Sequence, residues 1–386
     1  MTALISRLHG LSVAAPVAPP QPRLSWLSPL LAALCVGFTA SLGCAGPVTP
    51  PTAVVDSDDT VATTALTDAD TAQGSAAPRA AGADVDSGGA GSPDAAGRRR
   101  AARPPRPIPQ PAVLPGVPKI VAIGDLHGDI TATRAVLKLA GAIDDADHWI
   151  GGKLVVVQVG DQLDRGDGEK AILLLLDSVA DQAHQAGGAL HVLNGNHETM
   201  NVAQQFGYVT PGGWLDFADV PHVPNDALLG KFAPHQRGRV SALRPGGPYA
   251  KLLAGHNTIQ VIGDTVFVHG GVLPQHVTYG IAKINQEISA WMNNQAPAPQ
   301  SISSETSPVW SRHYSLDVDA EDCKLAAQAL AALHVKRMVV AHTVQSKGIN
   351  SVCGGLVWRI DVGISKHYGG LAQVLVVEGA SVVIAK

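Results

Sequence analysis

An octapeptide, GDQLDRGD at residues 160–167, constrains this chain more than any other feature, because it directly follows the apolar run KLVVVQV at 153–159. That run is short and rich in β-branched residues, which is typical of a buried parallel strand. Packing alone does not explain why such a strand ends in two carboxylates three residues apart and an arginine. Ligands bind at the carboxyl ends of strands in open α/β sheets, so the octapeptide predicts a functional site there.

Four other polar motifs belong with it: GDLHGD at 124–129, GNHE at 195–198, HGG at 269–271 and AHT at 341–343. The apolar patterns predict strands at 119–125, 153–159 and 189–193, with helices at 130–141 and 168–186 between them. This alternation implies a parallel sheet with right-handed crossovers. The carboxyl ends of its strands share one edge, so we expect the motifs to converge there.

The C-terminal half is rich in predicted strands. A hairpin is expected at 258–262 and 265–269, joined by Gly263-Asp264. Helices are expected at about 275–293 and 321–333, and four strands follow the second helix at 337–341, 356–361, 371–377 and 381–385. A C-terminal half this rich in strands predicts a second sheet packed on the first, within an α/β fold.

Composition divides the 386 residues into three parts. Residues 1–44 are interpreted as a signal peptide or lipoprotein signal, and 45–116 as a disordered linker rich in Ala, Asp and Pro that cannot bury enough apolar area to fold. Residues 117–386 form the predicted catalytic domain, with a cap at about 200–250. The formal net charge of −4 gives no support for a nucleic-acid partner.

The N-terminal apolar segment at 27–44 is about as long as the core of a signal peptide and short for a membrane span. Cys44 follows Leu42-Gly43, which resembles the lipobox of a bacterial lipoprotein, although Ser41 stands where an aliphatic residue is usual. An ordinary cleaved signal and an acid-poor transit peptide are the alternatives. We expect export to the periplasm or cell envelope, with a membrane tether if Cys44 is lipidated.

Two cysteines, Cys323 and Cys353, belong to the predicted domain, and neither lies in a CxxC pair. Export would allow a disulfide between them, but two unpaired thiols are the favoured expectation. The segment from Cys353 to Arg359 also matches C-x5-R, the phosphate loop of cysteine-dependent phosphatases. That loop needs a glycine-rich turn into a helix, whereas residues 356–360 have the pattern of a strand.

The motifs carry carboxylate, imidazole and amide groups but no thiolate, a donor set that suits Mn, Fe, Zn or Mg. Two such ions about 3.5–4 Å apart need one bridging carboxylate, and Asp161 on the middle strand is the natural choice. The residues predicted to hold the ions are Asp125, His127, Asp161, Asn196, His269 and His342.

Two metal ions on these ligands suit phosphate ester hydrolysis by a metal-activated hydroxide. The leaving oxygen needs a proton, and His197 is the candidate acid, with Asp164 holding its other nitrogen. Arg165 offers a planar fork for two phosphate oxygens. Glu198 is expected to orient His197 or a neighbouring loop.

GDxHG, GDxxDRG, GNHE, HGG and a histidine in (G/A)HT occur here in the order typical of calcineurin-like metallophosphoesterases, and the DRG resembles the phosphoprotein phosphatase type. Four longer segments resemble the Shewanella-like branch: NGNHETMN at 194–201, PGGPY at 245–249, PVWSR at 308–312 and IDVGIS at 360–365. The resemblance implies a four-layer α/β-β/α sandwich and a metal-dependent protein phosphatase.

The same resemblance implies roles for individual residues. Asp125, His127 and Asp161 would hold the first ion, for which manganese is expected. The second ion would be held by Asp161, Asn196, His269 and His342. The acid pair would be His197 and Asp164, and the phosphate contacts would be Arg165, Arg312 and Asn196.

Several alternatives remain open at this point. The substrate is a phosphoprotein carrying phosphoserine, phosphothreonine or phosphotyrosine, or else a nucleotide or other small phosphoester of the cell envelope. A catalytically inactive binding module would have lost a metal ligand, and every expected ligand is present. The cap arginines Arg237, Arg239 and Arg244 either line a phosphate pocket or are solvated, and solvation is the favoured expectation.

Overall fold

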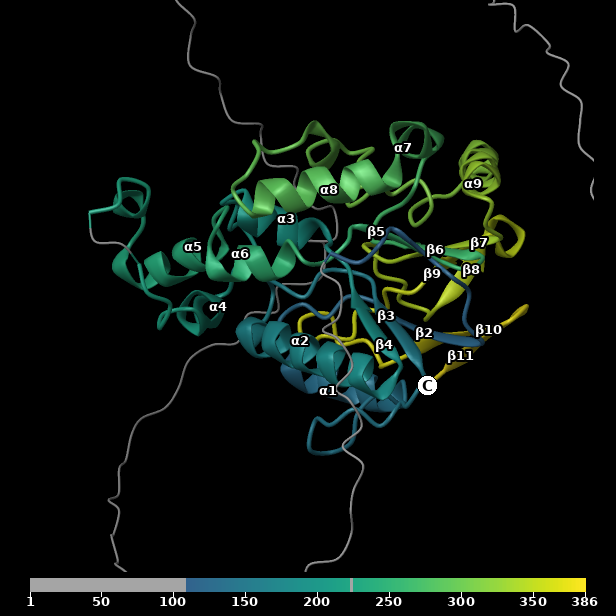
Figure 1. Ribbon diagram of the computed structural model, residues 1–386, viewed down its shortest axis with the longest axis horizontal. Coiled ribbons are helices and arrows are strands. Elements are labelled where there is room, and N and C mark those ends of the chain that lie inside the picture. Colours follow the sequence, from purple (N-terminus) through teal and green to yellow (C-terminus); the bar gives the residue numbers. More distant parts are fainter. Residues whose placement is uncertain (1–108, 223–224) are drawn as a thin grey trace, which may run out of the picture. The chain divides into compact units, whose positions relative to one another are not determined.

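A computed structural model of the protein describes residues 109–222 and 225–386. The predicted signal at 1–44 and nearly all of the predicted linker lie outside these residues. The described part contains two β-sheets with helices on their outer sides, as the sequence predicts (Figure 1).

The first sheet has five strands in the order β11-β10-β2-β3-β4. Its bounds are β2 Lys119–Ile123, β3 Val155–Gln158, β4 Ala189–Val192, β10 Val374–Glu378 and β11 Ser381–Ala385. The three predicted N-terminal strands are parallel, and their crossovers contain α1 (Ile130–Leu139) and α2 (Glu169–Ala186). Both helices lie on the outer face of this sheet (Figure 1). The predicted β-α-β-α-β unit is therefore confirmed.

The second sheet has six strands in the order β1-β5-β6-β7-β9-β8. Its bounds are β1 Val113–Leu114, β5 Ile259–Ile262, β6 Thr265–Val268, β7 Arg337–Val340, β8 Asn350–Val352 and β9 Val357–Arg359. The predicted hairpin is confirmed as β5 and β6, with Gly263 in its turn at φ +58°. The sequence analysis missed β1 and β8, which at two and three residues are too short to show a pattern.

The outer helices of the second sheet are α7 (Pro274–Tyr279), α8 (Ile281–Met292) and α9 (Ala320–Leu333) (Figure 1). The prediction of a single helix at 275–293 was wrong in one respect, because the helix is interrupted at Gly280, between α7 and α8. This residue has φ +104°, a conformation that glycine adopts without steric cost.

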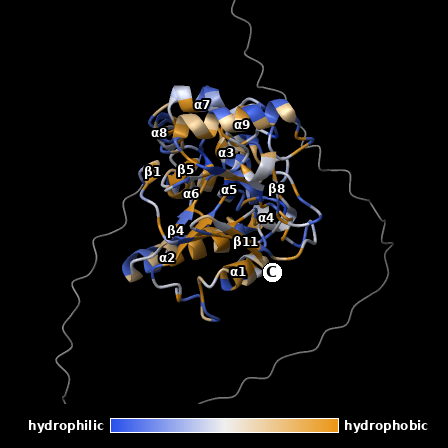
Figure 2. Cartoon of the chain, turned by 90° about the vertical axis from the view of Figure 1, so that its right-hand side faces the viewer, coloured by the Kyte–Doolittle hydropathy of each residue, from blue (hydrophilic) through white to orange (hydrophobic). Residues whose placement is uncertain are grey.

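Two clusters of apolar side chains form the core. One lies around the first sheet and includes Phe267 and Val339 of the second sheet, so the two sheets pack face to face. The other lies between the second sheet and helices α7–α9 and extends into the cap. The hydropathy colouring shows the apolar residues concentrated on the strands and on the inner sides of the helices (Figure 2). The layers are helices, sheet, sheet and helices, which is the predicted four-layer sandwich.

The cap consists of short helices at one end of the sheets (Figure 1). They are α3 (Asn196–Val202), α4 (Pro211–Asp216), α5 (Arg237–Leu243) and α6 (Pro248–Leu253), with short 3-10 turns at Leu229–Lys231 and Pro234–Gln236. Each α-helix has only six or seven residues, about two turns, so no apolar period could be read from the sequence. Phe217 and Leu243 are nevertheless fully buried, which anchors the cap to the domain.

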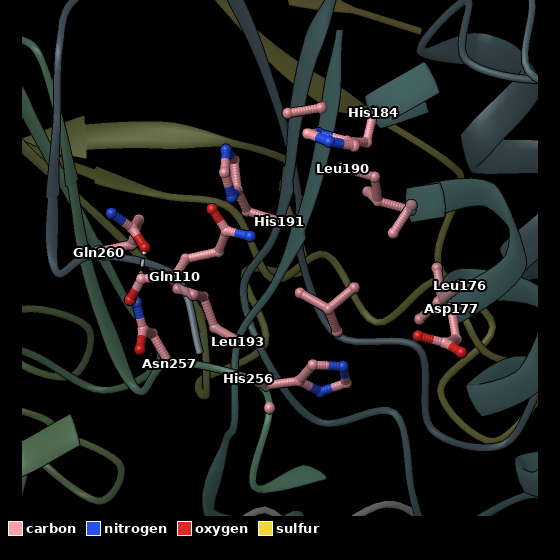
Figure 3. Close-up of a pocket in the computed structure, with 14 residues that line it drawn as sticks. Gln110, Leu176, Asp177, His184, Leu190, His191, Leu193, His256, Asn257 and Gln260 are labelled. Atoms are coloured by element: carbon pink, nitrogen blue, oxygen red, sulfur yellow. Dashed lines mark hydrogen bonds between the residues drawn. The ribbon is translucent and has the colours of Figure 1, made fainter. Parts of the chain in front are cut away.

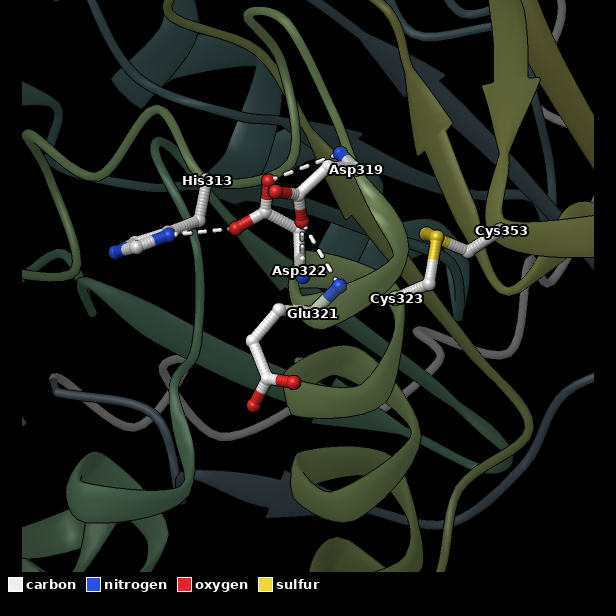
Figure 4. Close-up of a disulfide and its surroundings, with 6 residues drawn as sticks. All are labelled: His313, Asp319, Glu321, Asp322, Cys323 and Cys353. Atoms are coloured by element: carbon white, nitrogen blue, oxygen red, sulfur yellow. Dashed lines mark hydrogen bonds and ion pairs between the residues drawn. A yellow bond between two sulfur atoms is a disulfide. The ribbon is translucent and has the colours of Figure 1, made fainter.

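Cys323 and Cys353 form a disulfide, so the favoured expectation of two unpaired thiols was wrong. The bond joins the first turn of α9 to the connection between β8 and β9 (Figure 4). His313 contacts Asp322 beside it, with Nδ1 2.7 Å from Oδ1. In the described part of the chain, no helix combines the length and the apolar character needed to cross a bilayer.

Candidate active site

The five motifs converge where the strands of both sheets end. Asp125 follows β2, Asp161 follows β3, Asn196 follows β4, and His269 and His342 follow β6 and β7; all five side chains are at most 5% exposed. Asp161 is central, because its Oδ2 lies 3.1 Å from Nε2 of His269 and 3.8 Å from Nε2 of His127. Nε2 of His269 is also 2.8 Å from Oδ1 of Asn196.

The backbone of the site adopts conformations that side chains usually avoid. Five of its residues other than glycine have positive φ: His127 (44°), Asp161 (55°), Asp164 (66°), Arg165 (63°) and His342 (68°). Such residues occur at functional sites, where the surrounding fold holds them in place. Gly195 is required for a related reason, because a Cβ at this position would lie 2.1 Å from Oδ1 of Asp161.

Glu198 organises the loop that carries Asp161. Its carboxylate accepts hydrogen bonds from the backbone N–H groups of Gly195 (2.7 Å), Asp161 (2.9 Å), Gln162 (2.9 Å) and Leu163 (3.2 Å). Burial and the charge of Asp161 raise the pKa of Glu198 to about 7. Its contacts are those of a residue that orients a neighbouring loop.

The electrostatics of the cluster suit cation binding. Burial and the nearby carboxylates of Asp361 and Asp161 raise the pKa of Asp125 well above its usual value. Burial and the proximity of His197 lower the pKa of His127 to about 3. Burial and the charge of His269 likewise hold the pKa of His342 well below its usual value. His127 and His342 are therefore neutral imidazoles, the form that binds metal ions.

Unsatisfied atoms show that the cluster fits divalent metal ions. In residues 109–222 and 225–386, no hydrogen-bond partner of ordinary geometry contacts either carboxylate oxygen of Asp125 or Nε2 of His342. Buried polar atoms without partners are costly, and a bound cation would satisfy all three. Potential ligand atoms of Asp161, His269 and His342 lie within 4.8 Å of one another.

A second such group combines His127, Asp161 and His197. His197 differs from the others because its Nδ1 is 2.6 Å from Oδ2 of Asp164, while its Nε2 faces the cluster 3.8 Å from Oδ2 of Asp161. Burial disfavours the charged imidazole, but the carboxylates of Asp161 and Asp164 outweigh it and raise the pKa of His197. This geometry suits a proton donor better than a ligand.

A buried network supports Asp164, and the sequence analysis missed most of it. Asn201 Nδ2 donates to both oxygens of Asp164 at 3.0 Å, and Arg239 Nη2 donates to Oδ1 at 3.0 Å. Arg239 also pairs with Glu169 and is fully buried, so the expectation that it is solvated was wrong. Asn201 lies four residues after His197 on one helix, and this spacing was the available signal.

Arg165 lies between two tyrosines that were not predicted. Its guanidinium carbon is 4.7 Å from the ring centroid of Tyr208 and 5.2 Å from that of Tyr368. Arg312 contacts the AHT motif: its Nη1 donates to Oγ1 of Thr343, the neighbour of His342, at 2.7 Å. Both arginines thus belong to loops of the site.

An open pocket of about 700 Å³ adjoins the cluster. His127 and Arg165 line it, together with the N-terminus of α4 and the loop at Ser365, Lys366 and His367. Of the other cap arginines, Arg244 pairs with Asp226, and Arg237 donates to the carbonyls of Leu229 and Phe232. A separate, smaller pocket lies beside β4 and contains His184, His191 and His256 from different segments (Figure 3).

Comparison with known proteins agrees with this geometry. Residues 118–346 match the calcineurin-like phosphoesterase family. The chain is 41% identical over 290 residues to Shewanella-like protein phosphatase 2 of Arabidopsis thaliana, which covers 67% of this chain and 74% of that protein. It is 31% identical over 262 residues to Shewanella-like protein phosphatase 1 of Plasmodium berghei, which covers 65% of this chain and 69% of the relative.

Solved structures show the same fold. The cold-active protein-tyrosine phosphatase of a psychrophilic Shewanella species superposes with a TM-score of 0.57 at 24% identity, over 71% of this chain and 80% of that one. The family implies divalent metal ions, for which the clustered carboxylates and imidazoles provide ligands. This chain therefore belongs to the calcineurin-like phosphoesterases, as a metal-dependent phosphatase of the phosphoprotein phosphatase type in its Shewanella-like branch.

Proposed function

We propose that the protein removes phosphate from phosphoproteins with two divalent ions, manganese in the first instance. Two features of the site carry this proposal. Within the described residues, the carboxylate oxygens of Asp125 and Nε2 of His342 have no hydrogen-bond partner, and the buried candidate acid His197 is held through its Nδ1 by Asp164 at 2.6 Å. The relatives named protein phosphatases support the substrate class.

Residues Asp125, His127 and Asp161 would hold one ion, and Asp161, Asn196, His269 and His342 the other. Ions bound there would lower the pKa of water and offset the charge of the phosphate. Arg165, with Asn196 and Arg312 nearby, would bind phosphate oxygens; the two tyrosines around Arg165 restrict the directions its fork can take. As the P–O bond to the leaving group breaks, the proton on Nε2 of His197 would pass to the leaving oxygen.

Cysteine chemistry is a poor alternative for this domain. Cys353 is bonded to Cys323, and Arg359 lies on strand β9, where its Nε donates to Oδ1 of Asn350 at 2.7 Å. Neither residue forms the anion-binding turn before a helix that C-x5-R enzymes require.

The test uses the purified full-length protein, stripped with a chelator and assayed with p-nitrophenyl phosphate, a phosphotyrosine peptide and a phosphothreonine peptide. We expect turnover that returns with Mn²⁺ and persists after Cys323 and Cys353 are both changed to serine. The ratio of the two peptides then assigns the class of phosphoprotein. Metal-restored turnover of the small ester alone would replace the proposal with a small-molecule phosphoesterase.

We also propose that the domain works outside the cytoplasm, in the periplasm or cell envelope. Structural disulfides persist in oxidising compartments, and the domain contains one between Cys323 and Cys353. Cell fractionation of wild type and Cys44→Ala tests both export and lipidation: release of only the variant from membranes supports a lipid anchor. Recovery of both proteins in the cytosol with reduced cysteines would contradict export.

A further inference from the structure

Among the described residues, Arg239 is the largest side chain that is fully buried. It lies on α5 of the cap, and within the described residues its side-chain hydrogen bonds go to residues other than the predicted metal ligands. Removing a guanidinium from water costs several kcal/mol unless the charge is paired and its donors are satisfied. The partners of Arg239 therefore indicate what its position serves.

The contacts of Arg239 converge on the support of the acid. Nη2 donates to Oδ1 of Asp164 at 3.0 Å and to Oδ1 of Asn201 at 2.8 Å, and Nε donates to the same oxygen of Asn201 at 3.0 Å. Nη1 donates to the carbonyl of Gly213 at 3.0 Å and to Glu169. All five N–H donors of the guanidinium therefore have an acceptor, which fixes the side chain in one orientation.

Asp164 is oriented as a result. Its Oδ1 accepts from Arg239 and Asn201, and its Oδ2 is left facing Nδ1 of His197 at 2.6 Å. The carboxylate cannot rotate without breaking bonds on both sides. Asn201 Nδ2 also donates to the carbonyl of His197 at 2.9 Å, which fixes the helix turn that carries the imidazole.

Charge balance gives a second reason for Arg239. The Asp164 backbone N–H donates to Oε1 of Glu169 at 3.0 Å, so two fully buried carboxylates are neighbours. Burial opposes ionisation of Asp164, but its hydrogen bond with His197 and the charges of His197 and Arg239 lower its pKa overall. Without the guanidinium, the two carboxylates would repel each other in a site that water does not reach.

We propose that Arg239 is a positioning residue for catalysis, which holds Asp164 so that His197 presents its Nε2 proton to the leaving oxygen. This role rests on the proposed function. It makes the placement of cap helix α5 a condition for the acid step, although α5 itself carries no predicted metal ligand. Arg239 acts through Asp164 and touches no reacting atom.

The test exploits the dependence of acid catalysis on the leaving group. A poor leaving group such as phenolate needs the proton, whereas p-nitrophenolate leaves almost without it. With Mn²⁺-loaded full-length enzyme, Arg239→Met should lower kcat for phenyl phosphate by about 10- to 100-fold. Its kcat for p-nitrophenyl phosphate should fall by less than about threefold. Arg239→Lys keeps the positive charge but not the planar guanidinium, so it should also lower the ratio of kcat for phenyl phosphate to kcat for p-nitrophenyl phosphate. This variant replaces Arg239→Met in the test if Arg239→Met fails to fold.

Arg244→Met is the matched control, because Arg244 is also a cap arginine with a carboxylate partner, Asp226, but has no contact with Asp164. The ratio of its kcat values for phenyl phosphate and p-nitrophenyl phosphate should equal that of wild type. The double variant Arg239→Met, Asp164→Asn should have a kcat for phenyl phosphate only slightly below that of Asp164→Asn alone, because both changes remove the same support of His197. Equal losses on both substrates, or additive losses in the double variant, would overturn the role of Arg239. An inactive wild type would overturn the proposed function as well.

Discussion

Two groups of buried carboxylates in this domain are balanced in different ways. The ion pairs that Asp125 and Asp161 form in the described residues are with histidines. Asp164 and Glu169 are equally buried, but both pair with Arg239. The fold neutralises the second group by itself and leaves the first to bound cations. A shortage of protein cations around buried acids therefore distinguishes the metal centre from the acid support.

The largest expected effect comes from removing the shared carboxylate of the metal centre. Asp161→Asn should lower kcat for p-nitrophenyl phosphate by about 10³-fold or more, because both ions lose a ligand and several kcal/mol of transition-state stabilisation are lost. The bound-metal stoichiometry should fall in the same preparation, measured by elemental analysis. Asp145→Asn, which changes an exposed carboxylate paired with Lys138, should match wild type. Full activity in Asp161→Asn would contradict the assignment.

Removing the arginine that pairs with Asp164 and Glu169 should lower the free energy of unfolding. Arg239→Met leaves Asp164 and Glu169 without their cation, and removing one partner of a buried pair typically costs about 3–5 kcal/mol. The free energy of unfolding in urea, measured without metal, checks this. If Arg239→Met lowers the free energy of unfolding no more than Arg244→Met does, Arg239 does not stabilise the buried carboxylates of Asp164 and Glu169.

Adding metal should stabilise the folded protein through the carboxylates of Asp125 and Asp161, not through those of Asp164 and Glu169. At a free Mn²⁺ concentration 100 times Kd, each bound ion should add about 2.7 kcal/mol to the free energy of unfolding. Asp125→Asn should reduce this increment, because it removes a ligand whose oxygens lack other partners. Arg239→Met should leave the increment unchanged even though the starting stability is lower. Thermal unfolding with and without Mn²⁺ separates the starting stability from the increment that the metal adds. Loss of the increment in Arg239→Met would mean that metal binding depends on the ion pairs of Arg239.

A fourth expected effect is a pH dependence of the unfolding free energy that arises from the Glu169 carboxyl group. Burial and the nearby charge of Asp164 raise its pKa to about 8, despite the opposing charge of Arg239. A raised carboxyl pKa favours the folded state below the unfolded pKa, and this stability is lost as pH rises toward 8. Glu169→Gln should remove a slope of up to about 1.4 kcal/mol per pH unit from the unfolding free energy of the metal-free protein between pH 5 and 8. Parallel pH profiles for wild type and variant would exclude this assignment.

The sequence predicts the parts of the site that are encoded locally. Asp125, Asp161 and Asn196 each follow an apolar strand within four residues, so a parallel sheet must bring them to one edge. The strands and crossover helices were long enough for their period to identify them. The sandwich of two sheets also followed from the order of the elements.

The parts that sequence reasoning missed depend on contacts between distant segments. Arg239 lies on a seven-residue helix, and its partner Asp164 is 75 residues away in the chain. Cys323 and Cys353 are 30 residues apart, and their pairing depends on how α9 packs against the second sheet. Neither pattern has a period or a local motif that could reveal it.

By itself, the sequence determined the two-sheet architecture and the candidate residues for the metal ligands and the acid pair, because strand patterns and the motifs that follow them are local. Only the tertiary structure decided how the buried charges are balanced. Ionisation of a buried carboxylate depends on which cation lies within a few ångströms, and packing of the cap, not the order of residues along the chain, places Arg239 there.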